Sequence, residues 1–212
     1  YAKPSEVRLR ATAKADSAEA AETMLAPVVK EVADYLGDVV YGVDVPDLET
    51  VCMAHLKEKG WTFATAESCT GGLIASRIVE IPGASKVLGC GVVAYSEEIK
   101  KQVLGVSQST LSEKTAVSAE CAFEMARGVK TLAGADAAVA STGYAGPEGE
   151  NVGLVYVAAV GCGRELVQKL HLARGREDDR EQIRLMASSW ALRLALMLID
   201  GDTRLIDGRN GK

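Results

Sequence analysis

The eight residues "TAESCTGG", Thr65–Gly72, bring a carboxylate, hydroxyls, a thiol and two glycines together between an apolar run and an apolar helical pattern. Paired glycines where a strand turns into a helix let backbone N–H groups approach an anion or an oxyanion. Ser68 follows the predicted strand, which is where α/β sheets carry their active groups. The stretch therefore predicts a turn with Ser68 as a nucleophile, unless Ser68 or Thr70 merely caps the helix.

Two neighbours of Ser68 offer other chemistry. Cys69 is a rival nucleophile, because a thiolate at a helix N-terminus has a depressed pKa. Glu67 could orient Ser68, bind a metal or cap a backbone group. The turn matches neither the P-loop pattern nor the G-x-S-x-G elbow. Since no carboxylates stand at ligand spacing, we expect no metal.

If Ser68 is a nucleophile, a lysine could serve as its base. The two histidines, His55 and His171, fall on a predicted amphipathic helix and in a predicted strand, which favours structural roles. The stretch "AYSEEIKK" places Tyr95 at a strand end and Lys100 one helical turn beyond the start of the next helix. A desolvated lysine can lose its proton and relay it with a tyrosine. The alternative is a solvated lysine on a short helix.

Two further clusters carry groups that bind anions. In "STGYAGPEG", the hydroxyls of Ser141 and Thr142 and the N–H of Gly143 could hold a phosphate, or the segment is a plain turn. In "RGREDDREQIR", the arginines could form an anion clamp or lie on a solvated face with salt bridges. Those arginines are Arg174, Arg176, Arg180 and Arg184.

The elements that must position these residues alternate between apolar strands and helices. This order predicts an α/β protein, a three-layer α/β/α domain over residues 47–212, with a mixed sheet because the last two strands form a hairpin. We expect strands at residues 61–65, 86–95, 136–142, 152–161 and 165–173, and helices at residues 47–60, 73–79, 96–105, 118–132 and 178–200.

Residues 1–46 predict a separate small β-α-β segment. An alternating pattern over residues 7–13 indicates a strand. A helix is expected between Asp16, with Glu19 placed for a capping box, and Gly37. Residues 38–43 then indicate a second strand.

Composition excludes several classes of protein. The net charge of −5 argues against a surface built for nucleic acid. The five cysteines are odd in number and lack C-x-x-C spacing, so we expect neither a disulfide framework nor a zinc site. The expected location is the reducing cytoplasm. No uninterrupted apolar run reaches the roughly 18 residues of a membrane span, and no signal peptide pattern opens the sequence.

From about Leu48 to Ile199 the sequence resembles the CinA C-terminal domain, the nicotinamide mononucleotide (NMN) deamidase family. The resemblance rests on "TAESCTGGLIASRI", "GVVAYSEEIKKQVLGV", "AVS" at 116–118 and "STGYAGPEG". It implies hydrolysis of NMN to nicotinate mononucleotide and ammonia, without a metal or other cofactor. The implied catalytic residues are Ser68, Tyr95 and Lys100, and we expect the substrate to be bound by Glu67, Thr70, Gly71, Gly72, Thr142, Gly143 and Arg180.

In the expected mechanism, Lys100 takes the proton of Ser68, directly or through Tyr95, and N–H groups of the turn, with Gly71 or Gly72 among them, hold the oxyanion. Departures from the family pattern support an alternative, a degenerate nucleotide-binding or regulatory domain. The usual longer insert ending in "KPVG" is absent at Asn151, and two other positions differ, Glu97 and Asp178. We expect a homodimer.

Residues 5–45 resemble the KH-like segment that precedes this domain in CinA proteins. A KH module binds nucleic acid through a G-x-x-G loop, which is missing here. Acidic residues also outnumber basic ones in residues 1–46. A role for this segment in RNA binding is therefore not expected.

Overall fold

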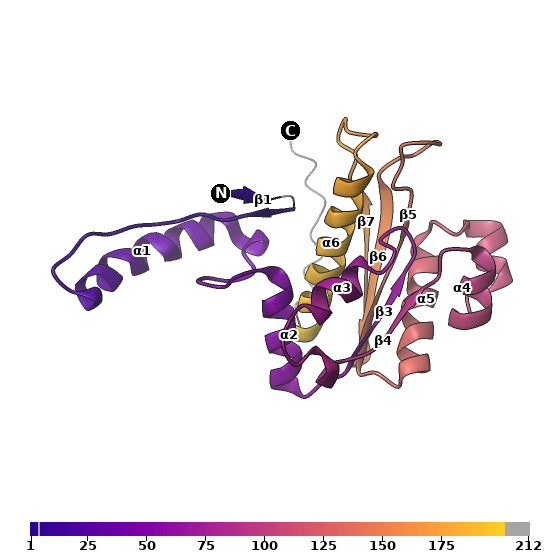
Figure 1. Cartoon of the computed structure of the whole chain (residues 1–212), viewed down its shortest axis with the longest axis horizontal. Helices are drawn as coiled ribbons and strands as arrows, with labels where there is room; N and C mark the ends of the chain where they lie inside the picture. Colours follow the sequence, from indigo (N-terminus) through magenta and orange to yellow (C-terminus); the bar gives the residue numbers. More distant parts are fainter. Residues whose placement is uncertain (4, 202–212) are drawn as a thin grey trace. The chain divides into compact units, whose positions relative to one another are not determined.

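The computed structural model describes residues 1–3 and 5–201, and the chain divides into two compact units, residues 1–44 and the residues from Val45 onward (Figure 1). The division falls close to the boundary expected between residues 46 and 47. The last part of the predicted second domain, residues 202–212, lies outside the described residues.

The first unit is built around one long helix. Strands β1 (Ala2–Lys3) and β2 (Glu6–Val7) pair antiparallel, and α1 (Ala18–Leu36) is followed by a 3-10 turn, Gly37–Val39. The helix is confirmed, and Gly37 ends it. Its N-cap is Ser17, whose hydroxyl accepts a hydrogen bond from the N–H of Ala20 at 3.1 Å.

Both strand predictions in the first unit were wrong. The strand expected at residues 7–13 ends at Val7, and residues 38–43 form a 3-10 turn and irregular chain. An alternating pattern forms a strand when its apolar face is buried against another layer. Here Val7 and Leu9 are 70% and 63% exposed, so the pattern has no such layer among the described residues.

The second unit contains a mixed five-stranded sheet in the order β4-β3-β5-β6-β7. Strand β3 pairs parallel with both β4 and β5, whereas β6 pairs antiparallel with β5 and β7. The strands are β3 (Phe63–Glu67), β4 (Leu88–Val93), β5 (Ala137–Gly143), β6 (Leu154–Gly161) and β7 (Arg164–His171). The mixed sheet is confirmed, and because β3 runs to Glu67, Ser68 is the first residue beyond it.

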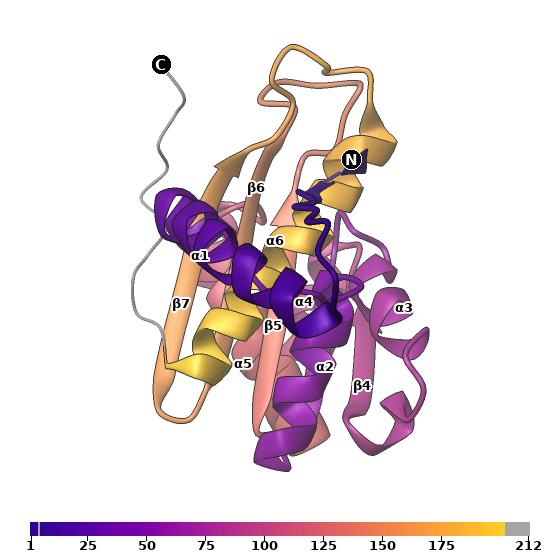
Figure 2. The ribbon, with the colours of Figure 1, turned by 90° about the vertical axis from the view of Figure 1, so that its left-hand side faces the viewer.

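Helices cover both faces of this sheet, which confirms the three-layer α/β architecture (Figure 2). One layer holds α2, α3 and α6, and the other holds α4 and α5. The helices are α2 (Leu48–Lys59), α3 (Leu73–Val79), α4 (Glu97–Leu104), α5 (Ala119–Ala133) and α6 (Arg180–Asp200), with short turns of helix at Ala84–Lys86 and Thr110–Lys114. Alternate residues of β3, Ala64 and Ala66, pack with Met125 and Val129 of α5 in one buried core.

Local signals decide where these helices begin. The side chains of Asp47, Ser96 and Ser118 each accept a hydrogen bond from a backbone N–H in the first turn of the helix that follows. By length and composition, α6 alone among the described helices could cross a membrane. However, 67% of its most apolar window is buried inside the protein, as expected of a core helix.

Candidate functional site

Ser68 lies on a sharp turn at the carboxyl end of β3. Its N–H donates to the carbonyl of Ser141 on β5 at 3.0 Å, which extends the parallel ladder by one residue. The N–H of Gly71 then donates to the Ser68 carbonyl at 3.1 Å and closes the turn. Gly71 and Gly72 have φ values of 61° and 94°, a region that favours glycine. The paired glycines therefore make the turn possible.

Lys100 contacts the Ser68 hydroxyl directly. Its Nζ donates to Ser68 Oγ at 2.9 Å and to the carbonyl oxygen of Ala94 at 3.0 Å. Only 2% of Lys100 and 8% of Ser68 is exposed. The cap at Ser96 starts α4 so that Lys100 lies in its first turn, beneath the end of β4. The two residues that the sequence singled out as nucleophile and base thus form a buried pair.

Burial lowers the pKa of Lys100 from its ordinary value of 10.5. Attractive interactions with Cys121, Cys69 and Glu97 raise the pKa, but they are weaker than the cost of removing the ammonium from water. Among the described residues, no carboxylate forms an ion pair with Lys100. A neutral amine is therefore accessible, and in that state Nζ can accept the proton of Ser68 while still donating to Ala94.

Cys69 has the properties of a structural thiol. It is 4% exposed, and burial raises the pKa of its thiol to about 11, although Lys100 and a contact with Ser141 act in the opposite direction. Near neutral pH the side chain is consequently a neutral thiol, which is a poor nucleophile. These observations favour Ser68 over Cys69.

Glu67 caps α3. Its carboxylate accepts hydrogen bonds from the N–H groups of Gly72, Ile74 and Ala75 at 2.9, 3.0 and 2.9 Å. The Thr70 hydroxyl donates to the same carboxylate at 2.7 Å. Of the three roles considered for Glu67, the structure shows the cap.

Four residues that were expected to bind substrate instead form hydrogen bonds within the protein, at the turn itself. Glu67 and Thr70 are 1% and 0% exposed, and their side-chain oxygens are bonded within the protein. The N–H groups of Gly71 and Gly72 are bonded to the Ser68 carbonyl and the Glu67 carboxylate. In this structure neither glycine N–H is available to an oxyanion, which corrects the expected mechanism.

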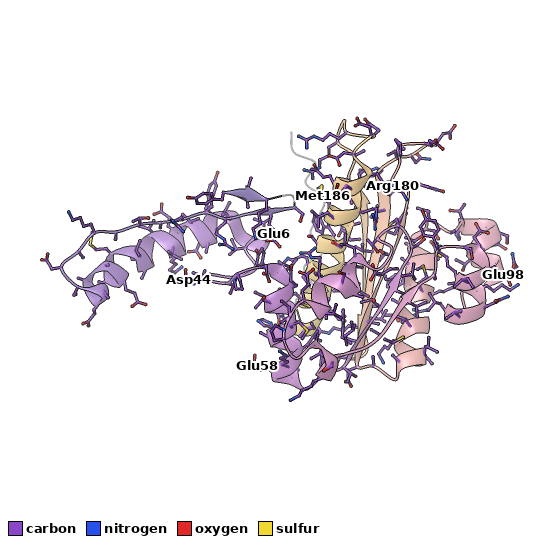
Figure 3. All side chains as sticks on the ribbon, viewed as in Figure 1. Glu6, Asp44, Glu58, Glu98, Arg180 and Met186 are labelled. Atoms are coloured by element: carbon purple, nitrogen blue, oxygen red, sulfur yellow. The ribbon has the colours of Figure 1, made fainter. Side chains whose placement is uncertain are left out.

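Tyr95 and Arg180 meet at the surface. Tyr95 is 64% exposed, and its hydroxyl accepts a hydrogen bond from Arg180 Nη2 at 3.0 Å. Arg180 also donates to the carbonyl of Gly146, and it lies at the amino end of α6 (Figure 3). Among the described residues, no hydrogen bond joins Tyr95 to Lys100 or Ser68. The lysine reaches the serine directly, so of the two routes considered for the proton the structure shows the direct one.

The segment after β5 is fixed by its neighbours. The Thr142 hydroxyl donates to the carbonyl of Ala116 at 2.6 Å, and Thr142 is buried. A Cβ on Gly143 would lie 2.7 Å from the Leu154 carbonyl, so glycine is needed where β6 passes. Thr142 and Gly143 thus hold the loop in place, and their expected contact with substrate is not visible in the free protein.

Arg184 is the residue that sequence reasoning missed. It was only one of four arginines in a possible anion clamp, yet its Nε donates to the Cys69 carbonyl at 3.1 Å and its Nη2 to the Thr70 carbonyl at 2.8 Å. No spacing signal identifies backbone carbonyls as partners across more than a hundred residues. The position of Arg184 one helical turn after Arg180 indicated only that both share a face.

The histidines take no part in this arrangement. His55 pairs with Asp200 at 2.7 Å, and His171 is exposed at the end of β7. Within the described part of the chain, no group of three potential ligands could hold a metal ion. The arrangement can therefore support chemistry in which the amine of Lys100 activates the hydroxyl of Ser68.

The fold and the site define a three-layer α/β protein with a buried serine–lysine pair at the carboxyl edge of its parallel strands. The family model described as "CinA C-terminal domain" matches residues 46–198, and that of "Damage-inducible protein CinA KH domain" matches residues 1–42. The chain belongs to the CinA family.

Two relatives illustrate the extent of the match. A CinA-like protein of Kosmotoga olearia is 45% identical over 203 residues, which covers 94% of this chain and 49% of the relative. A CinA-like protein of Desulfovibrio desulfuricans is 46% identical over 196 residues, with coverage of 91% and 46%. The chain thus spans about half the length of these curated relatives.

Solved structures share the fold. A CinA superfamily protein of Klebsiella pneumoniae superposes with a TM-score of 0.68 at 36% identity, covering 73% of this chain and 96% of that one. The competence/damage inducible protein CihA of Agrobacterium tumefaciens gives 0.67 at 35% identity, with coverage of 75% and 99%. These two matches therefore cover about three quarters of this chain and nearly the whole of each solved chain.

Proposed function

We propose that this chain is an amidohydrolase that converts NMN to nicotinate mononucleotide and ammonia. The observation that carries the proposal is the buried contact of 2.9 Å between Lys100 Nζ and Ser68 Oγ. A serine next to a desolvated lysine is an activated nucleophile for acyl transfer. The resemblance of the surrounding motifs to the NMN deamidase family supplies the substrate.

In the proposed reaction, neutral Lys100 takes the proton of Ser68 as Oγ attacks the carboxamide carbon. The C=O π pair moves onto oxygen, and when it returns, the C–N bond breaks. Lys100 gives its proton to the departing nitrogen, which leaves as ammonia. Water then attacks the nicotinoyl ester with Lys100 again as base, which releases the acid and restores the serine.

Arg180 is the proposed anchor for the phosphate of NMN. It is partly exposed, and its guanidinium joins the loop after β4, through Tyr95, to the loop after β5, through Gly146. A guanidinium presents a fork of donors that suits a phosphate. The exposed Tyr95 ring lies beside it and offers a face for the nucleotide.

Ammonia release from NMN by the purified chain tests the proposal, with Ser68→Ala and Cys69→Ala as the paired variants. We expect turnover by the wild type and by Cys69→Ala, and none by Ser68→Ala. Turnover by Ser68→Ala, or none by the wild type, contradicts the proposal. If calorimetry then shows nucleotide binding without ammonia release, the alternative of a degenerate binding domain holds.

A further inference from the structure

We infer that Arg184 is a positioning residue for the nucleophile turn (residues 68–72), and that it directs the N–H of Thr70 toward the oxyanion. This inference rests on the proposed acyl-transfer chemistry at Ser68. It replaces the expected role of the glycine N–H groups with another donor, and it gives a function to an arginine outside the set of expected site residues.

The contact between Arg184 and the turn has two points. Nε and Nη2 of the same guanidinium donate to two consecutive carbonyls, those of Cys69 and Thr70, at 3.1 and 2.8 Å. Arg184 stands on α6, where Ile183 and Ala187 are buried in the core, so the guanidinium is held by a rigid element. A Cβ added at Gly71 would lie 3.3 Å from Arg184 Nη2, which shows how closely the turn packs on this side chain.

The hydrogen bonds of the turn leave two donors next to the nucleophile. The N–H groups of Ser68, Gly71 and Gly72 are bonded to the Ser141 carbonyl, the Ser68 carbonyl and the Glu67 carboxylate respectively. The N–H groups of Cys69 and Thr70 have no hydrogen-bond partner among the described residues.

The peptide between Cys69 and Thr70 is trans, so its N–H and C=O point in opposite directions. With the Cys69 carbonyl held by Arg184, the N–H of Thr70 is turned away from the guanidinium. The Ser68 hydroxyl, two residues earlier, is bonded to Lys100, and α3 itself begins later, with Gly72 as its N-cap residue.

Electrostatics supports the same assignment. Among the described residues, no carboxylate forms an ion pair with Arg184, so its charge is not cancelled by a local partner. A positive charge behind a peptide polarises that peptide and strengthens its N–H as a donor to a developing oxyanion. Arg184 thereby acts through Thr70 without touching the substrate.

Kinetics of Arg184→Ala test the inference. We expect kcat for ammonia release to fall about 100-fold, the cost of a misplaced nucleophile or donor, with little change in KM. Low concentrations of guanidinium chloride should restore part of the lost rate in Arg184→Ala and none in Lys100→Ala. Arg127→Ala, which removes an exposed arginine paired with Glu165, is the control and should turn over like the wild type.

A second assay keeps the inference separate from the choice of substrate. A fluorophosphonate probe reacts with an activated serine, and the rate of Ser68 labelling is read from the intact mass without any NMN turnover. We expect labelling to be about 100-fold slower in Arg184→Ala than in the wild type and unchanged in Arg127→Ala. If the wild type is labelled but does not release ammonia, the proposed function fails while the role of Arg184 is still measured.

The pH profile of labelling separates positioning from a general electrostatic effect. No hydrogen bond joins Arg184 to Lys100 among the described residues, and Arg184 is not among the groups that shift the pKa of Lys100, so the midpoint of the acidic limb should stay where it is in the wild type. Wild-type labelling by Arg184→Ala, or a shifted midpoint with an unchanged plateau, would overturn the inference. If Arg184→Ala is unfolded at the assay temperature, Arg184→Lys serves instead: one ammonium replaces a two-point fork, and a partial loss supports the inference whereas full activity refutes it.

Discussion

At the scale of single residues, the proposed chemistry depends on a lysine that is buried and that forms no ion pair with a carboxylate in the described part of the chain. Burial lowers the pKa of Lys100, so the neutral amine is populated at a lower pH than for a free lysine. Because the base must be neutral to accept a proton, kcat/KM should rise with pH to a plateau. We expect the midpoint of that acidic limb to lie below 10.5. A pH–rate profile of the wild type measures it, and a midpoint at or above that value would exclude Lys100 as the base.

Replacing Lys100 by arginine keeps the charge and removes the base. We expect Lys100→Arg to lose about 10²- to 10⁴-fold in kcat, because a guanidinium does not give up its proton in this range of pH. Lys101→Arg, on the exposed side of the same helix, is the matched control and should retain its rate. Near wild-type turnover by Lys100→Arg would show that the lysine contributes only its positive charge, and that Tyr95 or water is the base.

The neighbouring thiol of Cys69 should be unreactive and should take no part in catalysis. Burial raises the pKa of Cys69 to about 11, so less than a percent of it is thiolate at neutral pH by the ordinary titration relation. We expect Cys69→Ala to keep most of its activity and iodoacetamide to modify Cys69 far more slowly than the exposed Cys162. Peptide mapping after a timed reaction compares the modification of Cys69 with that of Cys162. Rapid modification of Cys69 with loss of turnover would indicate that Cys69 is the nucleophile.

At the scale of elements, a carboxylate determines how α3 begins. Glu67 accepts hydrogen bonds from three N–H groups at the start of this helix, and Gly72, the N-cap residue, has no side chain to replace it. In Glu67→Gln the amide NH₂ would face some of these donors. We expect a loss of about 1–3 kcal/mol in the free energy of unfolding.

Chemical denaturation of Glu67→Gln measures this loss, and Glu80→Gln, an exposed carboxylate at the other end of the same helix, is the control. An unchanged midpoint in Glu67→Gln would show that the cap adds nothing to stability. A lower stability with intact fluorophosphonate labelling would show that the cap supports α3 without shaping the nucleophile.

The sequence predicted those elements whose signals are local. The caps at Asp47, Ser96 and Ser118 are short-range hydrogen bonds, and the helices expected from residues 47, 96 and 118 each begin directly after these residues. The strands expected in the first 46 residues failed because strand formation needs a partner layer, which no local pattern specifies.

The same distinction applies to the candidate site. Ser68 and Lys100 were recognisable by residue type and motif, and the structure brings them into contact. What could not be predicted is how backbone groups are shared within the turn, since this depends on Glu67 folding back under α3 and on Arg184 arriving from α6. Contacts between distant segments leave no periodic trace in a sequence.

At the scale of the whole molecule, the groups of the candidate site all belong to the second unit. Every buried apolar residue of the described chain also lies at or beyond Leu48, so residues 1–44 add none to a core. We expect the chain shortened to residues 45–212 to fold with a thermal midpoint within a few degrees of the full chain and to keep its rate of Ser68 labelling. Calorimetry and intact mass report the two results, and loss of the unfolding transition on truncation would show that the units depend on each other.

The position of β3 between two parallel neighbours has an evolutionary consequence. The chain leaves β3 toward β4 on one side and later returns to β5 on the other, so the distance between serine and lysine is set by strand order and by the first turn of α4. The longer connections after β5 and β7 approach the site through Gly146 and Arg180, not through the pair itself. A change of length there, as expected from the sequence at Asn151, would therefore alter the surroundings of the pair and leave the contact between serine and lysine unchanged.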